Sequence, residues 1–360
     1  MAIFYKINDK TFNNQFLAHY EAFKHKGKIA FYCNDGEYDK ACWDTEPEES
    51  FEFLMDLHAI RLRNKYEYLV LNWSGGTDSH TIYNVFKRNK IHINEIVVKY
   101  SLADSEFFPK ANADWIKNNH WDKATKITLI SDQDSSIRDI ILTNEDWIFS
   151  DTGGFRRYGF SGIDATDIKI VQDIHGVKDW GIITGYEKPK VYTYNNRWYA
   201  SMPDYSLRAA LGHLDNIECF FLEPMIHIKQ SHMLKNFLKS RPIPMGNRYK
   251  LDYYTEANAA GRHEELSLGV SLDQKTKNQR NQKDTIIDLN TKYEDFNTND
   301  EFLKEKLVDK DPFALKYVKG FYNLKQEAEF WQYLNRNWLT HDNAILSMKP
   351  IWSKPYDLGE

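Results

Sequence analysis

Leu69-Val70-Leu71-Asn72-Trp73-Ser74-Gly75-Gly76-Thr77-Asp78-Ser79 carries the strongest structural signal in the chain. It predicts a buried strand, a glycine-rich turn and the start of a helix. The residues from Tyr68 to Leu71 form a short apolar run, which is typical of a strand covered on both faces. Beyond the quoted stretch the spacing changes, because Ile82, Val85 and Phe86 lie at i, i+3 and i+4, on one face of a helix.

A turn of small residues at a helix N-terminus is suited to binding phosphate, because free backbone N–H groups and the helix dipole both point at the anion. Gly75 and Gly76 permit positive φ angles and a close approach of phosphate oxygens. Side-chain hydroxyl donors are added by Ser74, Thr77 and Ser79. Asp78 would repel a phosphate unless Mg²⁺ bridges the two, so Asp78 is the candidate metal ligand. The alternative is a turn that only connects strand to helix.

The motif is neither a Walker A loop nor a dinucleotide fingerprint, because no Lys follows the glycines and G-x-G-x-x-G is absent. Ser74 to Ser79 instead resembles the S-G-G-x-D-S signature of the PP-loop ATP pyrophosphatases, among them asparagine, GMP and NAD synthetases and tRNA-thiolation enzymes. The whole chain also resembles PP-loop proteins of large tailed phages that are similar to the asparagine synthetase C-terminal domain. The resemblance implies ATP and Mg²⁺ as cofactors and an ATP-binding fold of the HUP/PP-loop type.

Composition limits the class of protein. With 47 Lys and Arg against 52 Asp and Glu, the chain lacks the basic excess of most nucleic-acid-binding proteins, so nucleic acid is a possible but not a favoured partner. The three cysteines form no C-x-x-C pair, which argues against a structural zinc or a disulfide framework. The N-terminus lacks a signal-peptide core, and no run is long enough for a membrane span. We therefore expect a cytoplasmic protein with no membrane partner, in the host cytoplasm if it is phage-encoded.

Strands and helices alternate after the motif, which predicts an α/β fold with a parallel, doubly wound sheet. Further strands are predicted at Glu95–Tyr100, Lys126–Ile130 and Trp180–Thr184, a helix at Ala111–Lys117, and a hairpin across Lys190–Ala200. Thr45-Glu46-Pro47-Glu48 is interpreted as a capping box that opens a helix ending near Asn64. The predicted division is an N-terminal extension over 1–64, an ATP-binding domain over 65–200 and a mainly helical C-terminal lobe over 201–360.

Ligands of parallel sheets bind beyond the carboxyl ends of the strands, so Val98 and the segment after Thr184 are further candidates for ATP binding. PP-loop enzymes similar to asparagine synthetase carry a glycine and an acid in this second segment. The resemblance implies ATP contacts for Gly185 and ATP and Mg²⁺ contacts for Glu187, with an ordinary turn as the alternative. Lys188 is suited to neutralising departing pyrophosphate, or is a solvated lysine.

A basic and aromatic cluster, Phe155-Arg156-Arg157-Tyr158-Gly159, is the other candidate. Bidentate hydrogen bonds from Arg157, with Arg156 beside it, would clamp an acidic substrate or a phosphate tail. The same segment could equally begin a surface helix. Asp78, Lys188 and Arg157 are thus the candidate catalytic residues.

The reaction implied by the resemblance is cleavage of ATP to AMP and pyrophosphate. A carboxylate or carbonyl oxygen of a small-molecule or nucleotide substrate is adenylated, and ammonia or an amine then displaces AMP. Ala2 stands where an asparagine-type glutaminase needs Cys, so we expect free ammonia, an amine, or a separate ammonia-donating protein. Two alternatives stay open: an enzyme of phage origin that modifies a nucleotide, tRNA or DNA base, and a non-catalytic nucleotide-binding protein.

Overall fold

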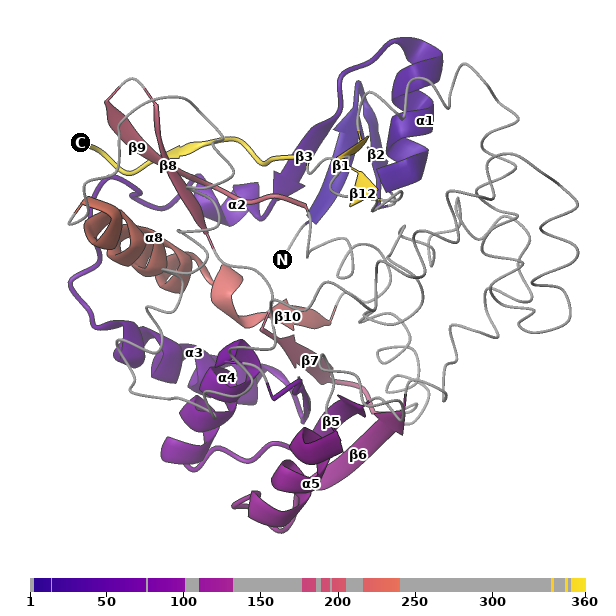
Figure 1. Ribbon diagram of the computed structural model, residues 1–360, viewed down its shortest axis with the longest axis vertical. Coiled ribbons are helices and arrows are strands. Elements are labelled where there is room, and N and C mark those ends of the chain that lie inside the picture. The colour runs from indigo at the N-terminus through magenta and orange to yellow at the C-terminus, as the bar shows by residue number, and fades with distance from the viewer. Residues whose placement is uncertain are drawn as a thin grey trace, which may run out of the picture.

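The structure, a computed structural model, describes residues 3–13, 15–75, 77–100, 110–131, 177–185, 189–194, 196–204, 216–239, 338–339, 347–348 and 351–360. Its central feature is a five-stranded parallel sheet of order β10-β7-β4-β5-β6 (Figure 1). The strands are β4 (Tyr68–Asn72), β5 (Glu95–Tyr100), β6 (Lys126–Ser131), β7 (Trp180–Thr184) and β10 (Ile217–Cys219). The chain runs outward from β4 to β6 and then returns to the other side of β4, which is the doubly wound order predicted from the sequence.

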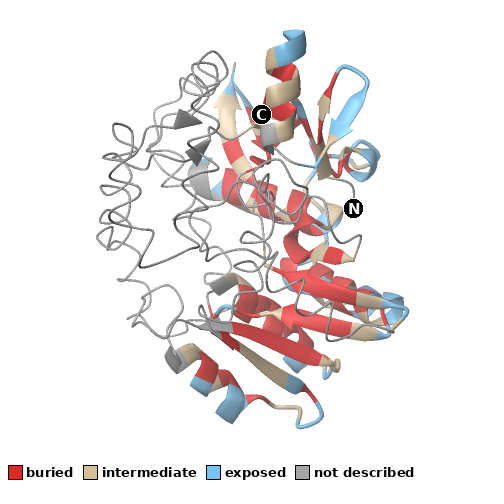
Figure 2. Cartoon of the chain, turned by 90° about the vertical axis from the view of Figure 1, so that its right-hand side faces the viewer, coloured by how far each residue is buried: buried red, intermediate tan, exposed pale blue. Residues whose placement is uncertain are grey.

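Within the described ranges, three helices cover one face of this sheet: α3 (Phe51–Lys65), α4 (Thr77–Arg88) and α5 (Lys110–Asn119). Side chains alternate between faces along a strand. Leu69 and Leu71 of β4 therefore enter the core beneath these helices, while Val70 packs with Val97 and Ile182 on the opposite face. All five side chains are buried, and Figure 2 shows that buried residues dominate the strands of this sheet. Burial on both faces explains the apolar run of β4.

Helix α3 begins later than the sequence predicted. Its N-cap is Ser50, whose hydroxyl accepts a hydrogen bond from the Phe53 backbone N–H at 3.1 Å. The interpretation of Thr45–Glu48 as the capping box is therefore wrong. The Pro47 carbonyl instead accepts a hydrogen bond from Lys229 Nζ at 2.8 Å. This segment therefore contacts the helix that contains Lys229 and does not begin a helix itself.

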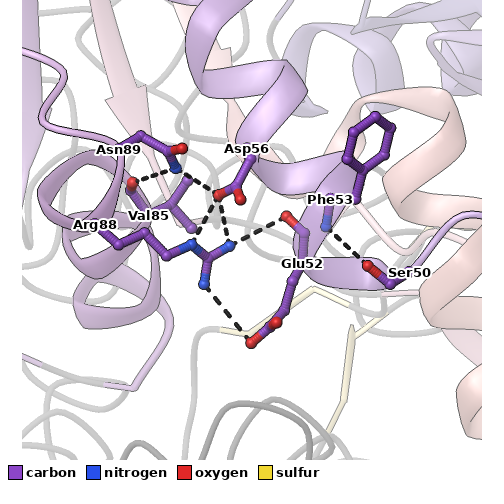
Figure 3. Close-up of polar contacts among 7 residues, drawn as sticks. All are labelled: Ser50, Glu52, Phe53, Asp56, Val85, Arg88 and Asn89. Carbon is purple, nitrogen blue, oxygen red and sulfur yellow. Dashed lines mark hydrogen bonds and ion pairs between the residues drawn. The ribbon is translucent and has the colours of Figure 1, made fainter.

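Helix α3 is joined to α4 by a polar contact on the surface (Figure 3). The Arg88 guanidinium donates from Nε to Asp56 Oδ1 at 2.8 Å and from Nη2 to the Glu52 carbonyl at 3.1 Å. Asn89 Nδ2 donates to the same Asp56 oxygen at 2.6 Å. These contacts hold the two helices side by side above the sheet.

The second part of the molecule is built from two antiparallel sheets around a separate core. Strands β1 (Ile3–Ile7), β2 (Lys10–Phe12) and β3 (Ala30–Cys33) form one sheet, and β8 (Lys190–Tyr194), β9 (Arg197–Ser201) and β13 (Tyr356–Asp357) form the other. Helices α1 (Gln15–His25), α2 (Asp35–Tyr38) and α8 (Pro224–Lys239) accompany them. The hairpin of β8 and β9 confirms the prediction for that segment.

Beyond residue 200 the described chain contains strands as well as a helix. Strand β10 belongs to the parallel sheet, a 3-10 turn, η2 (Phe220–Leu222), follows it, and β13 pairs with β9. The short strands β11 (Trp338–Leu339) and β12 (Ser347–Met348) pair with each other. Most of the predicted helical lobe lies outside the described residues, so it and the domain boundaries stay predictions.

Pro224 begins helix α8, because proline is well suited to the first helical position. The Glu223 carboxylate accepts a hydrogen bond from the Ile226 N–H at 2.9 Å and so caps this helix. Within the part of the chain that the structure describes, no helix has the length and apolar character required to cross a membrane.

Candidate functional site

The motif lies where the sequence predicted it, between the central strand β4 and helix α4. The Trp73 N–H donates to the Val97 carbonyl of β5 at 2.9 Å, which extends the strand pairing up to the turn. Gly75 has a φ of 75°, a left-handed conformation that favours glycine. Because β5 and β7 lie on either side of β4, the turn stands at the switch point of the sheet, the usual ligand position in this fold.

Ser74 and Ser79 close the turn across its two ends. The Ser74 N–H donates to the Ser79 hydroxyl at 3.1 Å, and the two hydroxyl oxygens are also 3.1 Å apart. Ser74 is exposed, while Ser79 is buried in the first turn of α4. The structure therefore brings these two predicted site residues into direct contact and leaves the Ser74 side chain accessible.

Gly185, which follows β7, lies against the first turn of α4. A Cβ placed on Gly185 would stand 3.1 Å from the Asp78 Cβ and 3.2 Å from the Ser79 nitrogen. Asp78 is half-buried, with its Oδ1 atom out of reach of solvent. Two segments that are far apart in sequence thus meet at the N-terminus of α4.

Four aromatic rings form a compact cluster behind the turn. Trp73, His80, Tyr83 and Trp115 lie with every pair of ring centroids between 5.3 and 6.5 Å apart. Burial lowers the pKa of His80 to about 4, so its imidazole is neutral at physiological pH. His80 consequently adds no positive charge to the turn, and attraction for an anion must come from other groups, such as the N-terminus of α4.

Asn112 of α5 is a contact of the turn that sequence reasoning missed. Its Nδ2 donates to the Ser74 carbonyl at 3.1 Å, and the same nitrogen stands 2.3 Å from where a Gly75 Cβ would be. No motif marks Asn112. The sequence could have pointed to Asn112 only through its position, in the first turn of the helix that follows β5. Strand β5 lies beside β4 in the sheet, so this helix begins close to the turn.

Val98, another predicted ligand contact, is buried in the core beneath the helices, and its side chain has no exposed surface. The other predicted site residues lie outside the described residues: Gly76, Arg157, Glu187 and Lys188. The Thr77 backbone begins α4. The part of the candidate site that the structure describes therefore consists of the turn from Ser74 to Ser79, Gly185 and Asn112.

The donor set of the turn suits a nucleotide with Mg²⁺. Helix α4 presents its N-terminus, the exposed Ser74 before it adds a hydroxyl that contacts Ser79, and Asp78 supplies a carboxylate in the first turn of α4. Mg²⁺ that accompanies phosphates is commonly held by one or two carboxylates together with phosphate oxygens. Among the described residues, no three His, Cys, Asp or Glu side chains gather into a metal cluster.

No family model and no curated protein matches this chain. Among solved structures, the chain is similar to an NH3-dependent NAD synthetase from Campylobacter jejuni subsp. jejuni NCTC 11168, solved in complex with the nitrate ion. The two share 15% sequence identity, and the match covers 79% of this chain and 97% of that chain with a TM-score of 0.28.

Proposed function

We propose that this chain is an ATP pyrophosphatase that binds ATP with Mg²⁺ at the turn from Ser74 to Ser79. The observation that carries the proposal is the position of an S-G-G-T-D-S turn at the switch point of a parallel sheet, where its serines meet and Gly185 packs against Asp78. A phosphate at this place would be bound by backbone N–H groups, by the dipole of α4 and by the exposed Ser74 hydroxyl.

The proposed reaction breaks the bond between the α-phosphorus and the bridging oxygen to the β-phosphate. A carboxylate or carbonyl oxygen of the substrate forms the new bond to phosphorus, and pyrophosphate leaves. Ammonia or an amine then attacks the activated carbon, and AMP departs with the substrate oxygen. Mg²⁺, when bound, would offset the charge that develops on the leaving phosphates.

The residues of the chain act mainly by positioning in this proposal. Asp78 would hold the metal, together with Glu187. Lys188 and Arg157 would offset the negative charge of pyrophosphate and of an acidic substrate. The substrate is a small molecule or a nucleotide, and the second nucleophile comes free or from a separate ammonia-donating protein.

Labelled ATP tests the first step. The protein is incubated with Mg²⁺, ammonia and ATP labelled at the α-phosphate, in parallel with panels of carboxylates, nucleosides and tRNA. We expect AMP and pyrophosphate in at least one panel, and the panel that responds identifies the substrate class. ADP and phosphate as the only products would contradict the proposal.

An oxygen label tests the second step. When the responding substrate carries ¹⁸O in its carboxylate or carbonyl, adenylation transfers one labelled oxygen to AMP. Labelled AMP is therefore the expected product in ordinary water. Unlabelled AMP, with label entering only from ¹⁸O-water, would show simple hydrolysis of ATP and exclude the ligase-type reaction.

A further inference from the structure

We propose that helix α5 fixes the orientation of the phosphate-binding turn, with Asn112 as a positioning residue and Trp115 as its support. The expected change in MgATP affinity rests on the proposed function. The expected change in hydrogen exchange of the turn does not depend on ATP. The two residues lie three positions apart in a helix and therefore share one face. Through Asn112 that face contacts Ser74, the first residue of the turn, and through Trp115 it contacts His80 of helix α4.

The hydrogen bond from Asn112 fixes one peptide plane. Asn112 Nδ2 donates to the Ser74 carbonyl at 3.1 Å, so this carbonyl points towards α5. In a planar trans peptide the C=O of one residue and the N–H of the next point in opposite directions. The N–H of Gly75 therefore points away from α5, and the Ser74 carbonyl cannot turn to that side while the bond to Asn112 persists.

A peptide plane next to a glycine is easily reversed, because glycine accepts both signs of φ. Gly75 has a φ of 75° in this structure. The Asn112 amide occupies the space that a Cβ on residue 75 would need. Reversal of the plane between Ser74 and Gly75 would exchange a donor for an acceptor on the side facing away from α5. An acceptor there would repel phosphate oxygens, so Asn112 holds the turn in its anion-binding form.

Trp115 keeps α5 at the distance that this bond requires. Its ring is stacked on Trp73 with centroids 5.8 Å apart and an interplanar angle of 19°, and it meets His80 edge-on at 5.3 Å. Trp73 directly precedes the turn and His80 directly follows it. The helix is thereby packed against the residues on both sides of the turn, which holds Asn112 beside Ser74 and Gly75.

A matched pair of variants on the same helix tests the inference. Asn112→Ala removes the bond to Ser74, and Asn119→Ala removes a bond of the same kind, from Nδ2 to the Trp115 carbonyl at 2.8 Å, that does not touch the turn. We expect the Kd for MgATP to rise roughly tenfold in Asn112→Ala, the scale of one lost hydrogen bond. Asn119→Ala should bind MgATP like the wild type, and both variants should keep a similar melting temperature.

Hydrogen exchange supplies the readout that needs no ATP. In the free protein, amides of residues 74–80 should exchange faster in Asn112→Ala than in the wild type or in Asn119→Ala. Asn112→Asp should exchange at least as fast, because it keeps the shape of the side chain but replaces the donor by a carboxylate that repels the Ser74 carbonyl. A merely structural role would let this near-isosteric variant behave like the wild type.

The two proposals fail in different ways. Unchanged exchange in both Asn112 variants would overturn the positioning role, whatever the affinity for ATP. MgATP binding by the wild type with an unaltered Kd in Asn112→Ala would overturn it as well. Faster exchange in the Asn112 variants of a protein that binds no ATP would support the control of the turn by α5 and contradict the proposed function.

Discussion

Gly185 and Asp78 lie in contact although more than a hundred residues separate them in the sequence: a Cβ on Gly185 would stand 3.1 Å from the Asp78 Cβ. The contact joins the end of β7 to the first turn of α4, the helix that follows the adjacent strand β4. Only glycine fits there without displacing the helix N-terminus. The candidate site thus depends on how closely these two segments approach.

Gly185→Ala is expected to move Asp78 and Ser79 by a few tenths of an ångström, because its methyl group meets backbone and Cβ atoms that cannot rotate away. We expect a loss of about 1 kcal/mol in the free energy of unfolding and a fall in pyrophosphate release on the order of tenfold. Gly36→Ala is the control, since a Cβ there meets nothing within 4 Å. Equal activities of the two variants would show that the contact has no role in the site.

Asp78→Asn should leave the fold intact and lower turnover by roughly 10²-fold or more, the scale of losing one preorganised charge-stabilising group. Asp114→Asn, at an exposed position of α5, is the control and should keep wild-type activity. Steady-state release of pyrophosphate and the melting temperature are measured together. Full activity in Asp78→Asn would refute its metal-ligand role and transfer that role to Glu187.

The stability of the protein should fall between pH 6.5 and pH 4. Burial lowers the pKa of His58, His80 and His227 from 6.5 to about 4 in the folded state. Below pH 6.5 the unfolded chain binds protons that the folded chain does not, so each histidine costs about 1.4 kcal/mol per pH unit in the free energy of unfolding. This stability is complete above pH 6.5 and is lost as the pH falls towards 4.

Urea unfolding at pH 7 and pH 5 checks this expectation. His80→Phe, which keeps a ring in the aromatic cluster, should lose about 2 kcal/mol less than the wild type on going from pH 7 to pH 5. Gly36→Ala serves as the control, because it removes no titratable group and its Cβ meets nothing within 4 Å, so it should leave the difference unchanged. Equal losses in the wild type and His80→Phe would show that His80 is not held neutral by burial.

Arg88→Ala should lower the free energy of unfolding by about 1 kcal/mol, because Arg88 joins α4 to Asp56 and Glu52 of α3 in one network (Figure 3). Lys40→Ala removes an ion pair with Glu37 in which both side chains are exposed, and should change stability little. Thermal or urea unfolding at low salt compares the two. A loss in Lys40→Ala as large as in Arg88→Ala would contradict the special role of the network.

The strand, the turn and the first turn of the helix could be predicted because their signals are local. An apolar run, two glycines and helical spacing after Ser79 describe short stretches of chain. The parallel sheet followed from repeated alternation of strands and helices, and the hairpin across Lys190–Ala200 from its own residues. Even local signals compete: Ser50 and Thr45 are both good N-cap residues, and it is Ser50 that caps α3.

A small-residue turn that follows a buried strand and opens a helix can be inferred from the amino-acid sequence, because each of these features depends on neighbours in the chain. The three-dimensional arrangement of the strands and helices is what brings Asn112 to Ser74 and Gly185 to Asp78, and what pairs β13 with β9. Such contacts join residues dozens to more than a hundred positions apart, and no local pattern encodes them. They arise when strands take their order in the sheet and each side chain settles on the partner that this order brings within reach.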